Sequence, residues 1–117
     1  MDIIICCFNK DDNSIEFSGA HSSFYLIRDS NLTCYKTDRY SIGGHINSTL
    51  LFSNQKVYLH KGDKLVFFTD GYMDQLNMLT KKKIGGSAFK KIIQTTENLP
   101  MNDQKQSIVK LFDEWRG

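Results

Sequence analysis

The sequence has little proline, little cysteine and no long hydrophobic run. Its three cysteines, Cys6, Cys7 and Cys34, are an odd number without metal-ligand spacing, so they predict neither a disulfide framework nor a zinc site. A reducing compartment, the cytoplasm, is therefore expected. No stretch approaches the roughly 18 apolar residues of a membrane span, and Asp2 stands where a signal peptide carries basic residues. We expect no membrane segment.

An excess of charge of one sign is also lacking. Fifteen basic and thirteen acidic side chains leave a net charge of +2, whereas nucleic-acid binding usually needs a clustered basic face. No nucleic-acid partner is expected. The one basic cluster, Lys81-Lys82-Lys83, is expected to be a solvated loop. With 117 residues, of which 40% are hydrophobic, the chain fits one globular domain spanning residues 1–117.

The first two thirds of the chain predict β-strands. Apolar runs and alternating patterns lie between turn clusters, which is typical of strands and hairpins. The first two strands are expected to pair as a hairpin, and three strands with tight connections to form an antiparallel meander. The last two are expected to pair through the turn Lys61-Gly62-Asp63. The predicted strands are 3–8, 14–18, 24–28, 32–36, 49–52, 55–60 and 64–69.

The last third changes to helical spacing. Apolar residues recur at i, i+3 and i+4 in two segments separated by Pro100, which predicts two amphipathic helices. Ser87 is expected to cap the first helix, and Asn102 or Asp103 the second. The predicted fold class is thus α+β: antiparallel β-sheets followed by two amphipathic helices. The apolar positions are Phe89, Ile92 and Ile93 in the first helix, and Ile108, Leu111, Phe112 and Trp115 in the second.

The candidate chemistry lies at the end of the strand 64–69. The unbroken apolar run from Leu65 to Phe68 predicts a fully buried strand, and Asp70 follows it. Asp74 would share a face with Asp70 only if the chain turns helical there. An Asp-Gly pair alone is most often a structural turn, but a carboxylate after a buried strand, with a second acid nearby, is also suited to Mg²⁺. Any further ligands must come from elsewhere.

The histidines and glycines elsewhere carry weaker signals. His21, His45 and His60 are isolated from one another, so a loop or surface role is favoured for each. The stretch around Gly43-Gly44 does not open a helix after a strand, which favours a turn over a phosphate-binding loop.

Several stretches together resemble a known family. They are Phe17 to Arg28, Ser41 to His45, Lys61 to Gln75, and the C-terminal part from Leu99 to Gly117. They are similar to metal-dependent protein serine/threonine phosphatases of the 2C type, in the bacterial branch named after stage II sporulation protein E. The most specific element is the order Gly-Asp, apolar strand, Thr-Asp-Gly.

The resemblance implies a β-sandwich flanked by helices, with two Mn²⁺ or Mg²⁺ ions at one end. In that family three segments supply metal ligands, and only the middle one is recognisable here, as Asp70. Gly71 and Asp74 would be its outer neighbours, and no catalytic residue is implied. Residues 1–117 therefore resemble the interior-to-C-terminal portion of a phosphatase domain, without its early and late aspartates.

Two main hypotheses follow. The chain is a portion of a phosphoprotein phosphatase that hydrolyses phosphoserine or phosphothreonine esters through a dinuclear metal site and is inactive alone. Its implied partner is a phosphoprotein of the anti-sigma-factor antagonist type. Whether the chain is itself an enzyme stays open, because two ligand segments are missing. The alternative is a non-catalytic interaction module, with a homodimer formed through exposed sheet surface. A third reading is an unrelated α+β domain with a chance Asp-Gly turn.

Overall fold

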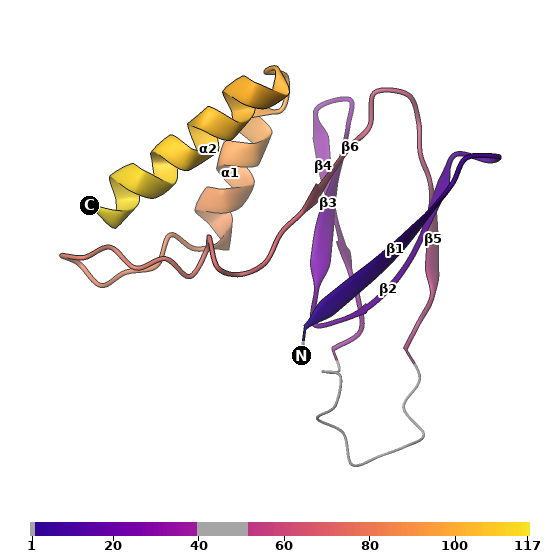
Figure 1. The fold of residues 1–117 in the computed structure, drawn as a ribbon, viewed down its shortest axis with the longest axis horizontal. Coiled ribbons are helices and arrows are strands. Elements are labelled where there is room, and N and C mark those ends of the chain that lie inside the picture. Colours follow the sequence, from indigo (N-terminus) through magenta and orange to yellow (C-terminus); the bar gives the residue numbers. More distant parts are fainter. Residues whose placement is uncertain (1, 40–51) are drawn as a thin grey trace, which may run out of the picture. The chain divides into compact units, whose positions relative to one another are not determined.

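The computed structural model describes residues 2–39 and 52–117. The chain divides into two compact units, Met1–Phe68 and Thr69–Gly117. The described residues of the first unit contain strands, and those of the second contain two helices with a preceding loop (Figure 1). This composition gives the predicted α+β class.

The strands described in the first unit, within residues 2–39 and 52–68, form two three-stranded antiparallel sheets. One has the order β1-β2-β5 and the other β4-β3-β6. The predicted hairpin between the first two strands is confirmed, and β3 and β4 form a second hairpin. The strands are β1 (Ile3–Asn9), β2 (Ser14–Ala20), β3 (Ser23–Arg28), β4 (Asn31–Lys36), β5 (Gln55–Tyr58) and β6 (Lys64–Phe67).

The two sheets share an aromatic core contributed by their middle strands. Phe17 on β2 meets Phe24 on β3 edge to face, with ring centroids 4.8 Å apart, and both rings are fully buried. Tyr35 on β4 stacks on Phe24 at 5.3 Å. Contact between side chains of opposite sheets is the packing of a β-sandwich. The predicted sandwich is confirmed.

Three expectations about the strands are wrong. The turn Lys61-Gly62-Asp63 does not close a hairpin, because β5 pairs with β2 whereas β6 pairs with β3. The meander fails for the same reason: β2 and β3 lie in different sheets, which lets both bury apolar faces against each other. The strand 64–69 is not fully buried either. It ends at Phe67, runs along a sheet edge and leaves Phe67 47% exposed.

The first strand is also less buried than its apolar sequence suggests. The apolar run of β1 suggests cover on two sides, yet Ile5 is 65% and Phe8 53% exposed. The reason is position, because among the described strands β1 pairs with β2 alone and forms one edge of its sheet. Of the strand predicted at 49–52, residues 49–51 lie outside the described residues, and Phe52 is not in a strand.

The second unit is built on the two predicted helices, α1 (Gly86–Thr96) and α2 (Met101–Arg116). Phe89 and Ile93 are buried on the apolar face of α1, as their spacing predicts. The predicted caps are wrong. The first helix starts before Ser87, after Gly85 at φ 85°, and the second starts directly after Pro100; neither has a side-chain cap. Proline presets the helical φ and needs no donor at this end, so Asn102 and Asp103 lie inside the helix.

Candidate metal-ligand turn

Asp70 lies in a single helical turn shortly after β6. Its carbonyl oxygen accepts a hydrogen bond from the backbone N–H of Asp74 at 2.8 Å, the i to i+4 pattern of an α-helix. The local condition for Asp70 and Asp74 to lie on one side of the turn is therefore met. Asp70 is exposed, so its carboxylate is open to solvent and to ligands.

Tyr72 anchors this turn to the two helices. Its hydroxyl donates to the carbonyl oxygen of Ile108 at 2.8 Å. Its ring lies 5.3 Å from those of Phe89 on α1 and Phe112 on α2, and burial raises the pKa of the phenol. The backbone that carries Asp70 is thus fixed on a packed scaffold. Sequence reasoning missed this residue, although an aromatic side chain directly after an Asp-Gly pair is the signal that could have found it.

Asp74 is engaged by a lysine rather than left free beside Asp70. The Nζ of Lys83 lies 3.1 Å from Oδ1 of Asp74, and both side chains are about half exposed. Lys83 reaches it because the chain returns after a loop, with the N–H of Gly85 donating to the carbonyl oxygen of Met73 at 2.9 Å. An exposed pair of this kind contributes little stability. It does, however, orient the Asp74 carboxylate.

Gly71 has no evident conformational reason to be glycine. Its φ is not in the left-handed region. A Cβ added there would meet only the hydroxyl oxygen of Thr69, at an ordinary contact distance of 3.6 Å. A glycine that neither dihedral angle nor crowding requires leaves the backbone open to close approach by a ligand.

The carboxylate oxygens at this turn are the type of ligand that a hard divalent cation prefers, but there are too few of them to form a complete site. Carboxylate oxygen is the ligand that Mg²⁺ prefers. Within residues 2–39 and 52–117, however, no three His, Cys, Asp or Glu side chains are grouped so that they could hold a metal ion. Asp70 alone does not make a dinuclear centre. The described residues therefore do not form the complete metal site that the resemblance implies.

The described histidines and cysteines do not add ligands to Asp70. His21 and His60 are exposed, and the backbone N–H of His60 donates to Asp63 at 2.7 Å. Cys6, Cys7 and Cys34 are free thiols, and burial raises the pKa of Cys6. His45 and the stretch around Gly43-Gly44 lie outside the described residues.

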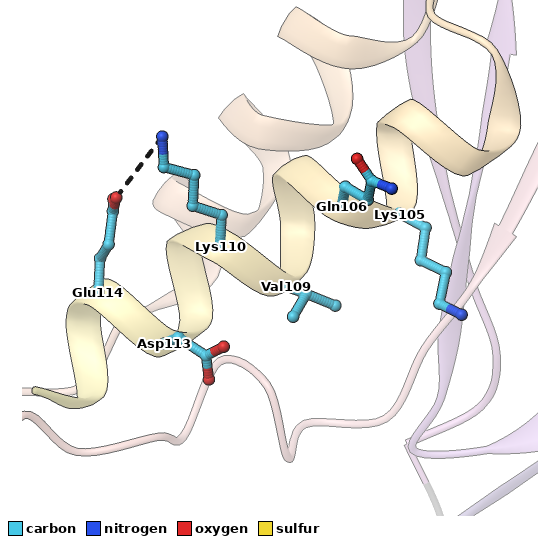
Figure 2. A pocket seen from close by; sticks show the side chains of 6 residues that line it. All are labelled: Lys105, Gln106, Val109, Lys110, Asp113 and Glu114. Carbon is cyan, nitrogen blue, oxygen red and sulfur yellow. Dashed lines mark ion pairs between the residues drawn. The ribbon is translucent and has the colours of Figure 1, made fainter.

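A shallow hollow of about 440 Å³ runs along the outer side of α2 (Figure 2). Only α2 side chains line it, and Lys110 reaches Glu114 at 3.8 Å across one turn. These side chains are mostly charged, and Asp70 is not among them, so the hollow adds nothing to the acidic turn. Its lining consists of Lys105, Gln106, Val109, Lys110, Asp113 and Glu114.

Comparison with known proteins gives one family and one fold. The family model described as stage II sporulation protein E matches residues 1–117. No curated protein matches the sequence. A similar solved structure is the SiaA-PP2C domain of Pseudomonas aeruginosa, with a TM-score of 0.84 and 22% identity. The match covers 99% of this chain and 45% of that one, so the chain spans less than half of the solved structure.

Proposed function

Because the chain belongs to the stage II sporulation protein E family of 2C-type phosphatases, we propose that it is a portion of a metal-dependent phosphoprotein phosphatase. The reaction is hydrolysis of phosphoserine or phosphothreonine esters. The match over all 117 residues is the observation that carries this proposal. The exposed carboxylate of Asp70, on a turn anchored by Tyr72, is the candidate position for its chemistry.

In this proposal Asp70 gives one carboxylate to a Mn²⁺ or Mg²⁺ centre, and other parts of the complete domain supply the remaining ligands. Gly71 lets the backbone lie close to that centre, and Asp74 is the outer neighbour oriented by Lys83. A single carboxylate binds such a cation weakly, so the 117 residues alone are inactive. Calorimetric titration with Mn²⁺ tests this point. Tight binding by the isolated chain, or phosphatase activity in it, would contradict the proposal.

A chimera offers the direct test of activity. Residues 1–117 would replace the matching 45% of the SiaA-PP2C chain, to which they are similar in fold. We expect Mn²⁺-dependent release of phosphate from a phosphoserine peptide. The Asp70→Asn variant should lose this activity, and Asp38→Asn, which changes a carboxylate that accepts hydrogen bonds from Ser53, should keep it. Equal rates for Asp70→Asn and the unchanged chimera would remove Asp70 from the metal centre.

The proposed substrate is a phosphoprotein of the anti-sigma-factor antagonist type, in the cytoplasm. Family membership supports the substrate class, and three free thiols fit a reducing compartment. The chimera should release phosphate from such a phosphoprotein faster than from a phosphotyrosine peptide. The reverse preference would rule out this substrate class.

The exposed edge of the first sheet favours a second candidate, a non-catalytic interaction module. On β1, which forms a sheet edge, Ile5 and Phe8 are more than half exposed. Exposed apolar edge strands tend to pair with another chain. Light scattering should then detect a homodimer that Ile5→Lys disrupts, with Lys10→Ala as the matched control. A monomer at high concentration would exclude this candidate.

A further inference from the structure

An apolar tip protrudes from the second unit, between the acidic turn and α1. Leu79 is 92% exposed, Met78 64% and Leu76 44%. Single exposed apolar residues are ordinary on protein surfaces, but three within four residues at one turn form a patch. In Figure 1 the loop that carries them runs beside the C-terminal end of α2, and the N–H of Met78 donates to the carbonyl oxygen of Arg116 at 3.4 Å.

The shape of this tip is fixed by Asn77. Its side-chain oxygen accepts hydrogen bonds from the N–H groups of Leu79 at 2.9 Å and Thr80 at 2.8 Å. Its side-chain amide donates to the carbonyl oxygen of Trp115 at 2.8 Å, which attaches the turn to α2. The backbone of Asn77 also exchanges bonds with Lys81 and Lys82, both at 2.9 Å. These hydrogen bonds fix the turn with Leu79 exposed to solvent. Binding therefore requires little further ordering of the backbone.

Positive charge flanks the apolar tip. Lys81, Lys82 and Lys83 follow it directly and are all exposed. Lys83 pairs with Asp74, whereas Lys81 and Lys82 form no ion pair within the described part of the chain. Exposed apolar side chains beside unpaired lysines match a binding partner whose outer layer is negatively charged and whose interior is apolar.

We propose that this tip, with the lysines that follow it, inserts reversibly into an anionic lipid surface. The lysines attract negatively charged head groups, and Leu79 and Met78 enter the boundary of the acyl region. A bilayer needs no shaped counterpart, so a small protruding tip suffices. A protein partner is less well matched, because specific interfaces bury on the order of 1,600 Å² around an apolar centre. The adjoining outer face of α2 is mostly charged (Figure 2).

The expected affinity is low. One myristoyl chain binds membranes with an association constant of only about 10⁴ M⁻¹, and two side chains bury less apolar surface than that. Each lysine near an anionic surface contributes about fivefold in partitioning. Partial insertion of Leu79 contributes about tenfold. The tip alone therefore gives only a weak and reversible attachment to a membrane.

The test is sedimentation of the 117-residue chain with lipid vesicles. Lipid concentrations on the order of millimolar are needed at this affinity. We expect binding to phosphatidylcholine vesicles that contain phosphatidylglycerol, weaker binding as salt rises, and none to phosphatidylcholine alone. Leu79→Asp should lower the partition coefficient at least tenfold, and Lys82→Gln about fivefold.

Matched variants elsewhere on the same unit control for charge and apolar content. Met101 is 67% exposed at the start of α2, so Met101→Asp repeats the Leu79 change away from the tip. Lys105→Gln repeats the Lys82 change. Both should bind vesicles as the unchanged chain does, and circular dichroism should show equal folding. Absence of binding to anionic vesicles, or equal binding by Leu79→Asp, would overturn the proposal. Self-association without lipid that Leu79→Asp abolishes would overturn it in favour of a second copy.

Discussion

Arg28 and Asp63 form a two-pronged ion pair that ties the end of β3 to the connection between β5 and β6. The Arg28 Nε lies 3.0 Å from Oδ1 of Asp63, and Nη2 lies 2.6 Å from Oδ2. The same Nη2 donates to the carbonyl oxygen of Tyr58 at 2.9 Å. Arg28 ends β3 in one sheet, and Tyr58 ends β5 in the other. The guanidinium therefore holds the connection between the sheets, and the Asp63 side chain is only 4% exposed.

Removing either partner should destabilise the first unit. We expect Asp63→Ala to lower the free energy of unfolding by about 2 kcal/mol, because it removes hydrogen bonds to a charged group. Arg28→Ala should cost more, since it leaves a buried carboxylate without its cation. Urea denaturation measures both. Lys56→Ala removes the exposed pair with Asp12 and is the control with a much smaller effect. Equal losses in all three variants would refute the special role of Asp63.

The same pair predicts how stability depends on pH. The Arg28 guanidinium, with help from the His60 N–H, holds the pKa of Asp63 below its ordinary value. The unfolded chain therefore takes up a proton near pH 3.9, before the folded one does. The stabilisation is complete above that pH and is lost as pH falls through the lower folded-state pKa. Asp63→Asn should remove this part of the acid sensitivity. Parallel pH profiles for the two proteins would contradict it.

The sequence predicted the elements better than their assembly. Local periodicity predicts the hairpin of β1 and β2 and both helices. The patterns lie within the segments concerned, residues 3–20 and 86–116. The division into two sheets depends on the pairing of β5 with β2 and of β6 with β3, which join segments far apart in the sequence, and no local pattern contains those contacts. Gly62-Asp63 therefore indicated a hairpin turn where the chain changes sheets.

The sequence identified the acidic turn at Asp70, but it did not identify the contacts that hold this turn in place. The sequence left open whether the chain turns helical from Asp70 to Asp74; the turn is present, with a local hydrogen bond between the two residues. The ion pair of Asp74 with Lys83 and the bond from Tyr72 to Ile108 depend on how the loop and α2 return to the turn. The role of Asp70 as a metal ligand stays a prediction.

Loss of the Tyr72 hydroxyl should loosen the turn that carries Asp70. We expect Tyr72→Phe to lower the free energy of unfolding by about 1 kcal/mol, the usual contribution of one hydrogen bond. Tyr72→Ala should cost about 3 kcal/mol, because the contacts with Phe89 and Phe112 are lost as well. Thermal denaturation followed by circular dichroism measures both. Tyr58→Phe, at a 58% exposed tyrosine, is the control and should leave stability unchanged. A Tyr72→Phe protein as stable as the unchanged chain would show that the hydroxyl bond contributes nothing.

Substitution of Gly71 tests whether glycine is needed at this position for the fold or for function. Gly71→Ala should keep stability or raise it by about 0.5 kcal/mol, because a Cβ fits there and the unfolded chain loses freedom. Gly85→Ala is the contrast: φ is 85°, so alanine should cost about 1 kcal/mol. If Gly71 lies beside the metal centre as proposed, Gly71→Ala in the SiaA-PP2C chimera should nevertheless reduce Mn²⁺-dependent hydrolysis, because the added methyl group would keep the centre from a close approach to the backbone. Full activity with unchanged stability would place the metal centre away from Gly71, whereas lost stability would mean that the glycine is there for the fold.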